Sequence, residues 1–377
     1  MVNKGCRYVP ILKARRGEFG AVEHMNADER LHVMPLFEVP PIPWDHVNHT
    51  PGKTIDQHLK NLGKNIQSSW TNDRACFVDL GLLHEAERMA NGRHPVRAMF
   101  KEFRHRELKV IPVTGLIRDK DHQTACSDAL QTDGLGICFR IQPEDFRDEH
   151  GFKRSLDGLL KRFEVTAREV DLILDLGPLN ENEGSDTSRA LSFIKTIPTL
   201  ESWRTFAVAA TGFPVNLAGF PQSTISGISR EEWELWQGLI SSPNIVRIPV
   251  FGDYAIAHAE HTDVDPRKMT TSACIRYTSA NSWVICRGKG LRRNGFEQFH
   301  NVARTLIGHA SYKGPEFSWG DKYISDCAER RVGCGNLTTW RKVGTSHHIA
   351  FVNRQLAKSS FSSADHERSA VISVGRS

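Results

Sequence analysis

The segment Tyr8-Val9-Pro10-Ile11-Leu12-Lys13 is a short apolar run that ends on a lysine and leads into a charged turn. The same order of an apolar run, an ionisable residue and a turn recurs at residues 34–38, 75–79, 137–140 and 171–175. Runs that are continuously apolar, rather than alternating, are typical of strands covered on both faces, as in a parallel sheet. This pattern therefore predicts a buried parallel sheet with charged residues at one end.

Eight strands of this kind are predicted, and helix-like segments separate them. Their ranges are 8–12, 33–38, 75–79, 109–114, 135–140, 171–175, 204–209 and 245–250. Strands that alternate with helices in about 250 residues favour a (β/α)8 TIM-type barrel, an α/β fold, over residues 1–262. A doubly wound open sheet is the alternative, but no GxGxxG turn follows the first strand.

The remainder of the chain predicts an α+β extension, residues 263–356, packed on the barrel. It contains a strand pair at 273–277 and 283–286, a helix at 296–310 and a final strand at 347–352. Gly320, between an aromatic and an acidic residue, predicts a tight turn. The Ser-rich, polar tail 357–377 is expected to be disordered.

The composition is that of an ordinary globular domain. Of the 377 residues, 39% are hydrophobic and 25% charged, and no apolar run is long enough to span a bilayer. The first residues lack a signal-peptide core, so we expect a cytoplasmic protein with no membrane partner. The formal net charge of +5 permits binding of phosphate or nucleic acid without requiring it.

The eight cysteines occur without a CxxC pair, and several lie in apolar runs, so buried free thiols are expected. Cys327 and Cys334 are separated by six residues and precede His347 and His348. This spacing is only a weak indication of a zinc site.

Four segments resemble the phage beta protein family, and the resemblance covers about residues 6–356. The segments are Tyr8-Val9-Pro10-Ile11-Leu12-Lys13 with Arg16-Gly17-Glu18, Pro35-Leu36-Phe37-Glu38-Val39-Pro40-Pro41, Phe317-Ser318-Trp319-Gly320-Asp321, and Trp340-Arg341-Lys342-Val343-Gly344 with His347-His348-Ile349. The resemblance implies a phage or mobile-element context, and with it a role in phage–host conflict. It implies no particular chemistry.

Charged residues stand at the C-terminal ends of most predicted strands: Lys13, Glu38, Asp79, Arg140, Asp175 and Asp253. In a barrel these ends meet at one mouth, where active sites are built. Charges that converge in a partly buried place must pair with each other or bind a ligand, because an isolated buried charge is very costly. Two interpretations follow, a closed salt-bridge network or a ligand site that also includes Tyr254.

If the mouth is a site, two chemistries fit it. Glu38, Asp79 and Asp175 could bind Mg²⁺ or Mn²⁺, since hard cations prefer carboxylate oxygens. Lys13 and Arg140 would then offset phosphate charge during metal-assisted phosphodiester hydrolysis. Alternatively, Lys13 and Arg140 clamp an anion while Glu38 acts as acid or base.

A second group of candidates lies in the extension: Trp319, Asp321, Trp340, His347 and His348. His347 with Asp321 could act as a general acid–base pair, and the tryptophans and His348 could contact a ligand, for example by stacking on a base. Packing of the aromatic rings in a core is the alternative. In a strand, neighbouring histidines face opposite sides, so we expect at most one of them at a site.

Together these observations predict a phage-associated metal-dependent enzyme, a phosphodiesterase or nuclease-like hydrolase, that acts on a phosphate-bearing or nucleic-acid substrate. The alternative is a non-catalytic interaction protein that binds a host or phage macromolecule. In that case the charged mouth is a structural network or a docking surface.

Overall fold

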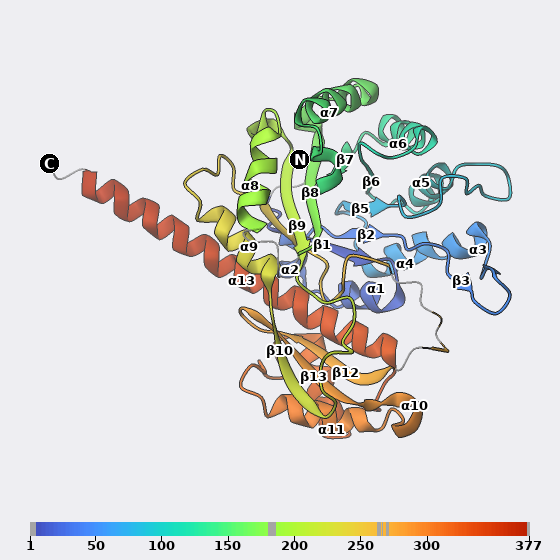
Figure 1. Ribbon diagram of the computed structural model, residues 1–377, viewed down its shortest axis with the longest axis vertical. Helices are drawn as coiled ribbons and strands as arrows, with labels where there is room; N and C mark the ends of the chain where they lie inside the picture. Colours follow the sequence, from blue (N-terminus) through green and yellow to red (C-terminus); the bar gives the residue numbers. More distant parts are fainter. Residues whose placement is uncertain (1–4, 180–185, 262–264, 266, 269–270, 375–377) are drawn as a thin grey trace.

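The computed structural model describes residues 5–179, 186–261, 265, 267–268 and 271–374, with side chains up to residue 359. Its larger part is a closed barrel of parallel strands in the spatial order β1-β11-β9-β8-β7-β6-β5-β2 (Figure 1). The strands are β1 Tyr8–Lys13, β2 Leu36–Glu38, β5 Cys76–Asp79, β6 Val110–Thr114, β7 Ile137–Ile141, β8 Val170–Pro178, β9 Thr205–Thr211 and β11 Val250–Asp253. Neighbours around the barrel are successive barrel strands of the chain, which confirms the predicted (β/α)8 fold.

Helices surround the barrel and cover its outer face (Figure 1). They are α1 Arg16–Glu23, α2 Ala27–His32, α3 Ile55–Leu59, α4 Leu62–Ser69, α5 Pro95–His105, α6 Lys120–Asp133, α7 Glu149–Phe163, α8 Asp186–Thr196 and α9 Glu231–Ile240, with 3-10 turns η1 Pro143–Phe146, η2 Ala167–Glu169 and η3 Leu200–Ser202 and a small hairpin of β3 Trp44–Asp45 and β4 Thr50–Pro51. One of the helix-like segments expected between strands covers residues 17–31. The chain instead starts a second helix at Asn26, whose side chain forms a capping box with Glu29.

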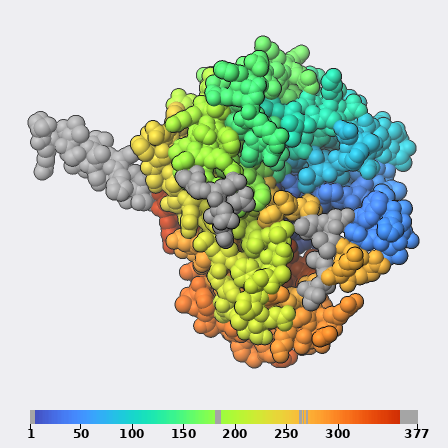
Figure 2. Space-filling model, viewed as in Figure 1, coloured from blue at the N-terminus to red at the C-terminus, as the bar shows by residue number. Residues whose placement is uncertain are grey.

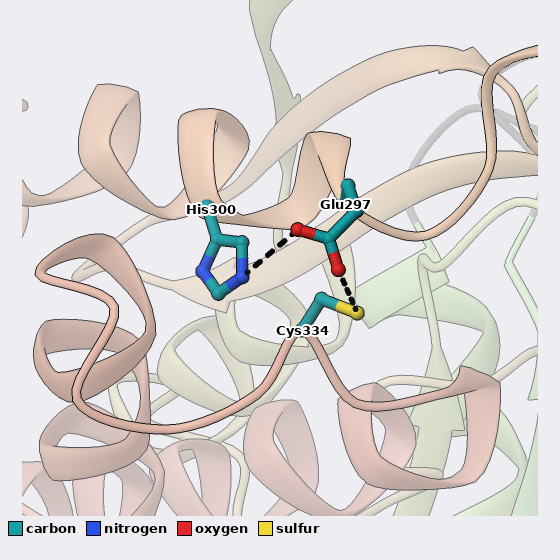
Figure 3. Close-up of side chains that lie close together, drawn as sticks. All are labelled: Glu297, His300 and Cys334. Carbon is teal, nitrogen blue, oxygen red and sulfur yellow. Dashed lines mark hydrogen bonds and ion pairs between the residues drawn. The ribbon is translucent and has the colours of Figure 1, made fainter.

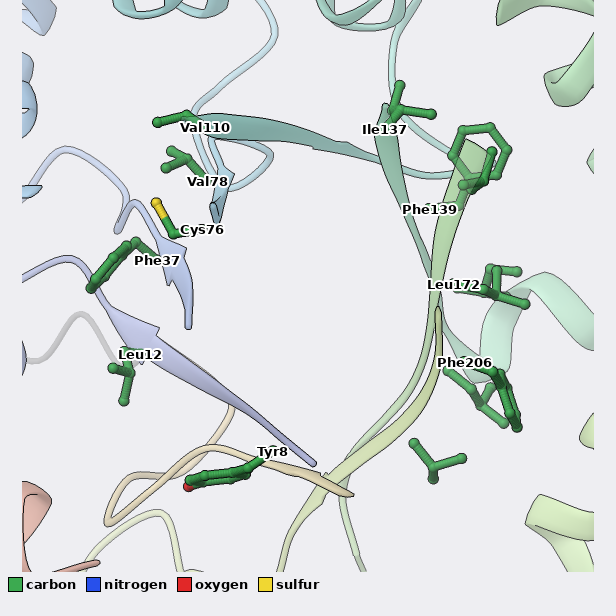
Figure 4. Close-up of a cluster of buried hydrophobic side chains, with 14 of the residues drawn as sticks. Tyr8, Leu12, Phe37, Cys76, Val78, Val110, Ile137, Phe139, Leu172 and Phe206 are labelled. Atoms are coloured by element: carbon green, nitrogen blue, oxygen red, sulfur yellow. The ribbon is translucent and has the colours of Figure 1, made fainter. Parts of the chain in front are cut away.

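Successive strand residues point alternately out of the barrel and into it. Leu12, Phe37 and Phe139 point outward, into the layer between strands and helices (Figure 4). Their neighbours Ile11 and Leu36 belong to a separate cluster of inward-facing residues in the barrel lumen. Side-chain direction in a strand alternates with a period of two residues. Every second residue, up to the C-terminal end of the strand, therefore points into the barrel.

The eighth strand lies later than the sequence predicted. The run 245–250 was expected to form it, but Val246 and Ile248 are 67% and 62% exposed, and β11 begins only at Val250. Arg247 holds the preceding segment on the outside of the barrel by donating to the carbonyl oxygens of Leu200 and Trp203, at 2.9 and 2.7 Å. Side chain–backbone bonds therefore override the apolar pattern here.

The extension contains a three-stranded antiparallel sheet in the order β10-β13-β12. Its elements are β10 Thr224–Ser229, β12 Ser272–Thr278, β13 Ser282–Gly290, α10 Leu291–Asn294, α11 Gln298–Ile307, α12 Trp319–Ala328 and α13 Leu337–Val374. The strand pair β12–β13 was predicted. The third strand, β10, comes from the connection between β9 and α9 and crosses from the barrel to the extension (Figures 1 and 2).

Helix α13 replaces the predicted strand at 347–352, and its range extends to Val374. It runs between the two parts of the molecule (Figure 1). Trp340 and Val343 belong to the core of the extension, whereas Ile349 and Val352 belong to that of the barrel. Within the described part of the chain, no helix has both the length and the apolar content needed to cross a membrane.

Gly320 lies within α12 and not in the predicted tight turn. A Cβ atom at this position would lie 2.3 Å from the carbonyl oxygen of Val343, so glycine allows α12 to approach the backbone of α13. We expect Gly320→Ala to lower the free energy of unfolding by about 1–3 kcal/mol, because the two helices must separate. Urea unfolding measures this change.

The matched control is Gly333→Ala, because no atom lies within 4 Å of a Cβ built there. This variant should stay within about 0.5 kcal/mol of the wild type. Equal stability of the two variants would contradict the close approach of α12 and α13.

Candidate functional site

Arg140 occupies the centre of the barrel's C-terminal mouth. Its guanidinium nitrogen Nη1 donates to Glu38 Oε1 and to Asp79 Oδ2, each at 2.8 Å. Its Nε donates to Asp175 Oδ2 at 2.8 Å. One guanidinium group thus binds the three carboxylates that the sequence offered as metal ligands.

The remaining atoms of these carboxylates have partners as well. Lys13 donates to Glu38 and to the carbonyl oxygen of Ala259. Arg118, from the loop after β6, donates to Asp79 Oδ2 at 3.1 Å. The Tyr254 hydroxyl donates to Asp175 Oδ2 at 2.7 Å and accepts from Arg140 at 2.7 Å.

The pKa values of the network reflect this mutual compensation. Burial by itself would raise the pKa of Asp79, but the charges of Arg118 and Arg140 outweigh it and hold that pKa at about 2. Burial likewise opposes ionisation of Glu38, yet Arg140 and Lys13 bring its pKa below the ordinary value. Three cationic and three anionic side chains therefore neutralise one another in a buried cluster.

The three carboxylates do not fit a divalent metal ion. The guanidinium of Arg140 already lies between them, where a shared Mg²⁺ or Mn²⁺ would have to sit. Among the described residues, the one group whose ligand atoms gather as a metal site requires lies elsewhere, in the extension. The mouth corresponds to the closed salt-bridge network, and we derive no metal-dependent step from it.

Asp253 does not join this network, although it ends a barrel strand. Phe251, two residues earlier in β11, faces the outer core, so Asp253 also points outward. It accepts hydrogen bonds from the Tyr8 hydroxyl at 2.6 Å and from His348 Nε2 at 2.7 Å. Tyr254, one residue later, points into the barrel lumen.

His347 and His348 both form buried pairs with carboxylates. They lie on α13, where neighbouring residues are about 100° apart rather than opposite. His347 Nδ1 contacts Asp321 Oδ2 at 2.8 Å, and Nε2 contacts the carbonyl oxygen of Thr278 at 2.9 Å. Both partners only accept, so His347 donates from both nitrogens and is the charged imidazolium.

The two tryptophans of the extension are packed against protein groups. Trp340 stacks on Phe299 with ring centroids 4.6 Å apart. Trp319 stacks on His24 at 4.4 Å, and Lys342 Nζ lies 4.2 Å from the Trp319 ring. Both rings thus serve packing in the structure, and neither offers a free face for stacking a base.

A cavity of about 130 Å³ adjoins the charged network where the barrel meets the extension. Its lining residues come from the end of β1, from α1, from the loops after β1, β9 and β11, from β12 and from α13: Lys13, Arg15, Glu18, Pro214, Val215, Ala257, His258, Glu260, His261, Arg276 and Arg341. Arg15, Val215 and Glu260 are exposed and form its outer edge. The cavity therefore connects the buried mouth with solvent.

Arginine side chains dominate this cavity, and they are only partly compensated. Arg276 donates to the carbonyl oxygen of Ile256 at 2.7 Å, and Arg341 approaches the same oxygen at 3.3 Å. Burial and the nearby charge of Arg341 lower the pKa of Arg276 to about 10. The lowered pKa means that the protein around Arg276 disfavours its positive charge, which an anion would relieve.

Two further lining groups are suited to an anionic ligand. His261 Nδ1 lies 3.4 Å from Arg15 Nη2, so its hydrogen is on Nε2, which is buried and has no hydrogen-bond partner among the described residues. Burial and the charges of Lys13 and Arg15 lower the pKa of His261 to about 4, so the ring is neutral at pH 7. Glu18 is buried, and this burial raises its pKa.

A second cavity is larger, at about 680 Å³, and lies beside α3. Its ionisable lining residues, Lys53, Asp56, Glu87 and Arg88, are all partly exposed. Water screens such groups, so size alone does not make this cavity the better candidate.

Sequence reasoning missed Arg118 and Arg276 because neither stands at the end of a barrel strand. Glu18 and Arg341 lie in the family-like segments 16–18 and 340–344, and Arg15 directly precedes the first of them. Nothing in the sequence shows that these distant segments meet. In the structure, Arg341 passes over Gly17, where a Cβ atom would lie 2.6 Å from Arg341 Cγ. That contact brings the two segments together at the cavity.

Comparison with known proteins gives a match over most of the chain. No curated protein matches it. The family model described as Beta protein matches residues 8–354, which include the barrel strands, the β10-β13-β12 sheet and the first half of α13. The chain therefore belongs to the Beta protein family.

Proposed function

We propose that this protein acts on a phosphate-bearing substrate, a nucleotide or the end of a nucleic acid, whose phosphate enters the cavity of Arg15, Arg276 and Arg341. The observation that carries the proposal is the convergence of these arginines with only partial compensation by Glu18. Guanidinium groups bind phosphate oxygens through paired, charge-assisted hydrogen bonds.

The position of the cavity supports the same ligand. TIM-barrel enzymes frequently bind phosphate in the loops after the seventh and eighth strands. Here β9 and β11 are those strands, and Pro214 and residues 257–261 follow them. A volume of about 130 Å³ equals roughly four water molecules, which suits a phosphate group with the rest of the substrate outside.

Glu18 is the cavity-lining group best suited to proton transfer. Its buried carboxyl has a raised pKa, and it lies 3.7 Å from Arg341 Nε, within the cavity that receives the phosphate. A carboxyl group with a raised pKa is a better proton donor to a leaving oxygen at a given pH than an ordinary carboxyl group. We therefore place the acid–base function of a hydrolase on Glu18 rather than on Glu38, whose carboxylate is fixed between Lys13 and Arg140.

Thermal unfolding with inorganic phosphate, ATP and a single-stranded oligonucleotide tests the binding step. At constant ionic strength, each phosphate probe should raise the unfolding midpoint of the wild type above that in chloride. Arg341→Met should weaken binding by roughly 10- to 100-fold, since one hydrogen bond to a charged group contributes about 1.5–3 kcal/mol. Glu18→Gln should keep binding but abolish release of phosphate or nucleotide product.

Arg331→Met is the matched control, because Arg331 is an exposed arginine of the extension paired with Asp326. It should bind the probes like the wild type. An equal response of the wild type and Arg341→Met to all three probes would exclude the cavity as the phosphate site.

A non-catalytic interaction protein is the second candidate, and the fully paired mouth favours it. Its charged side chains already satisfy one another, as expected of a structural network. Under this alternative, the protein binds a host or phage macromolecule without turnover. Phosphate binding that Arg341→Met weakens, with no product formed by the wild type, would support it over the enzyme.

A further inference from the structure

Three side chains with metal-binding atoms meet in the extension, away from the barrel mouth. Glu297 precedes α11, His300 lies in the first turn of that helix, and Cys334 lies in the loop between α12 and α13 (Figure 3). One ligand atom from each lies within 4.8 Å of the other two. The cluster joins the start of α11 to a loop that is distant in sequence.

The two spacings that involve Glu297 match those of a tetrahedral metal site. Glu297 Oε1 lies 3.6 Å from Cys334 Sγ, and Glu297 Oε2 lies 3.5 Å from His300 Nε2 (Figure 3). With zinc bonds of about 2.0–2.3 Å, neighbouring ligand atoms of a tetrahedron are about 3.3–3.8 Å apart. An ion can thus enter with small side-chain rotations.

His300 is already oriented as a metal ligand. Its ring is buried, and Nδ1 donates to the carbonyl oxygen of Cys327 at 2.6 Å. In the neutral ring this bond leaves the lone pair on Nε2, which faces the carboxylate of Glu297. Metal-binding histidines typically donate their other N–H to such a carbonyl.

Two acceptors that face each other need a cation between them, either a proton or a metal ion. The nearest protein cation is Arg330, whose Nη1 lies 3.5 Å from Glu297 Oε2, but its side chain is 58% exposed and can turn into solvent. Binding of a metal ion to Cys334 would release the proton of its thiol.

We propose that Glu297, His300 and Cys334 bind a transition-metal ion, Zn²⁺ by their chemistry, with water in the fourth position. A thiolate and an imidazole favour zinc over Mg²⁺ or Ca²⁺. The ion fixes the loop that carries Cys334 to α11. His347 and His348, which the sequence associated with Cys334, are instead held by Asp321 and Asp253. The site is independent of the proposed phosphate cavity.

Cobalt substitution of the full chain tests the proposal. The purified wild type should contain about one zinc ion per chain, and Co²⁺ in its place should give a thiolate-to-cobalt charge-transfer absorption. Cys334→Ser should abolish this absorption, and Glu297→Gln should weaken Zn²⁺ binding by at least about tenfold. Cys6→Ser and Glu329→Gln are matched controls outside the cluster and should behave like the wild type.

Folding is checked by the unfolding midpoint without metal, where Cys334→Ser should equal the chelator-treated wild type. If the wild type binds no stoichiometric Zn²⁺, or if Cys334→Ser retains the charge-transfer band, the cluster is only a set of hydrogen bonds and the proposal fails.

Discussion

Replacement of Arg140 by methionine is expected to unfold the barrel at neutral pH. The variant leaves Glu38, Asp79 and Asp175 buried without the guanidinium that binds all three. Removal of one partner from a buried ion pair costs about 3–5 kcal/mol, and this group has three such contacts. A domain is stable by only about 5–15 kcal/mol, so circular dichroism and urea unfolding should show a largely unfolded chain.

The pH dependence of this variant should be weaker in acid than that of the wild type. In the wild type the pKa of Asp79 is depressed to about 2, so its contribution is present above pH 3.8 and is lost as the pH falls toward 2. Without Arg140, only Lys13 and Arg118 oppose the effect of burial, so the pKa values of Glu38 and Asp79 rise from those of the wild type. The stability of the variant should therefore fall less between pH 4 and pH 2 than that of the wild type.

Arg97→Met provides the matched control for Arg140→Met. Arg97 pairs with Asp128 at the surface, and both side chains are about half exposed. Such pairs contribute about 0–1 kcal/mol, so this variant should remain folded. If Arg140→Met were equally stable, the mouth would not be a structural network. A wild-type midpoint raised by Mg²⁺ or Mn²⁺, and no longer raised in Asp79→Ala plus Asp175→Ala, would restore the metal prediction.

The second large effect is expected for Asp321→Asn. Asp321 is completely buried and accepts hydrogen bonds from His347 at 2.8 Å and from the Tyr277 hydroxyl at 2.6 Å. The amide leaves the imidazolium of His347 buried without a counter-charge. We expect a loss of about 3–5 kcal/mol in the free energy of unfolding, measured by urea titration at pH 7.

The stability of Asp321→Asn in acid, below pH 4, provides a second measurement. Burial alone would raise the pKa of Asp321, but the charge of His347 and hydrogen bonds from His347, Ser318 and Tyr277 hold it below 3.8. Its contribution is therefore present above pH 3.8 and is lost below it. Asp321→Asn lacks that contribution, so its stability should fall less between pH 4 and pH 2 than that of the wild type.

Asp326→Asn is the control on the same helix. Asp326 pairs with Lys322 and Arg331, whose side chains are 64% and 54% exposed. Its loss should cost no more than about 1 kcal/mol. A comparable loss in both variants would mean that the buried pair of Asp321 and His347 contributes no more than a surface pair.

The barrel itself could be predicted from the sequence because its strands are covered on both faces. Each strand is then a continuous apolar run, and the helices between them impose parallel connections. The eighth strand was wrongly predicted at 245–250, because apolar composition does not show where a strand is hydrogen-bonded. Only the register of β11 with β1 and β9 places that strand at Val250–Asp253.

The approach of charged groups to the barrel mouth was also predictable, since inward residues at parallel strand ends must converge. Asp253 could have been excluded by counting alternate residues from Phe251, which is an outward residue. His347 and His348 could not be placed, because a short run with apolar residues fits either a strand or a buried helix. The position of helix α13 is set by its contacts with both the core of the barrel and the core of the extension.

The sequence by itself determined the barrel and the residues that line its mouth, because strand periodicity is a local property of the chain. The tertiary structure alone decided that Arg140 neutralises three carboxylates, and that Arg276 and Arg341 meet Arg15 beside them. Pairing of charges depends on distances between segments as far apart as residues 15 and 341. Those distances are set by the packing of α13 against the barrel, and no local pattern contains them.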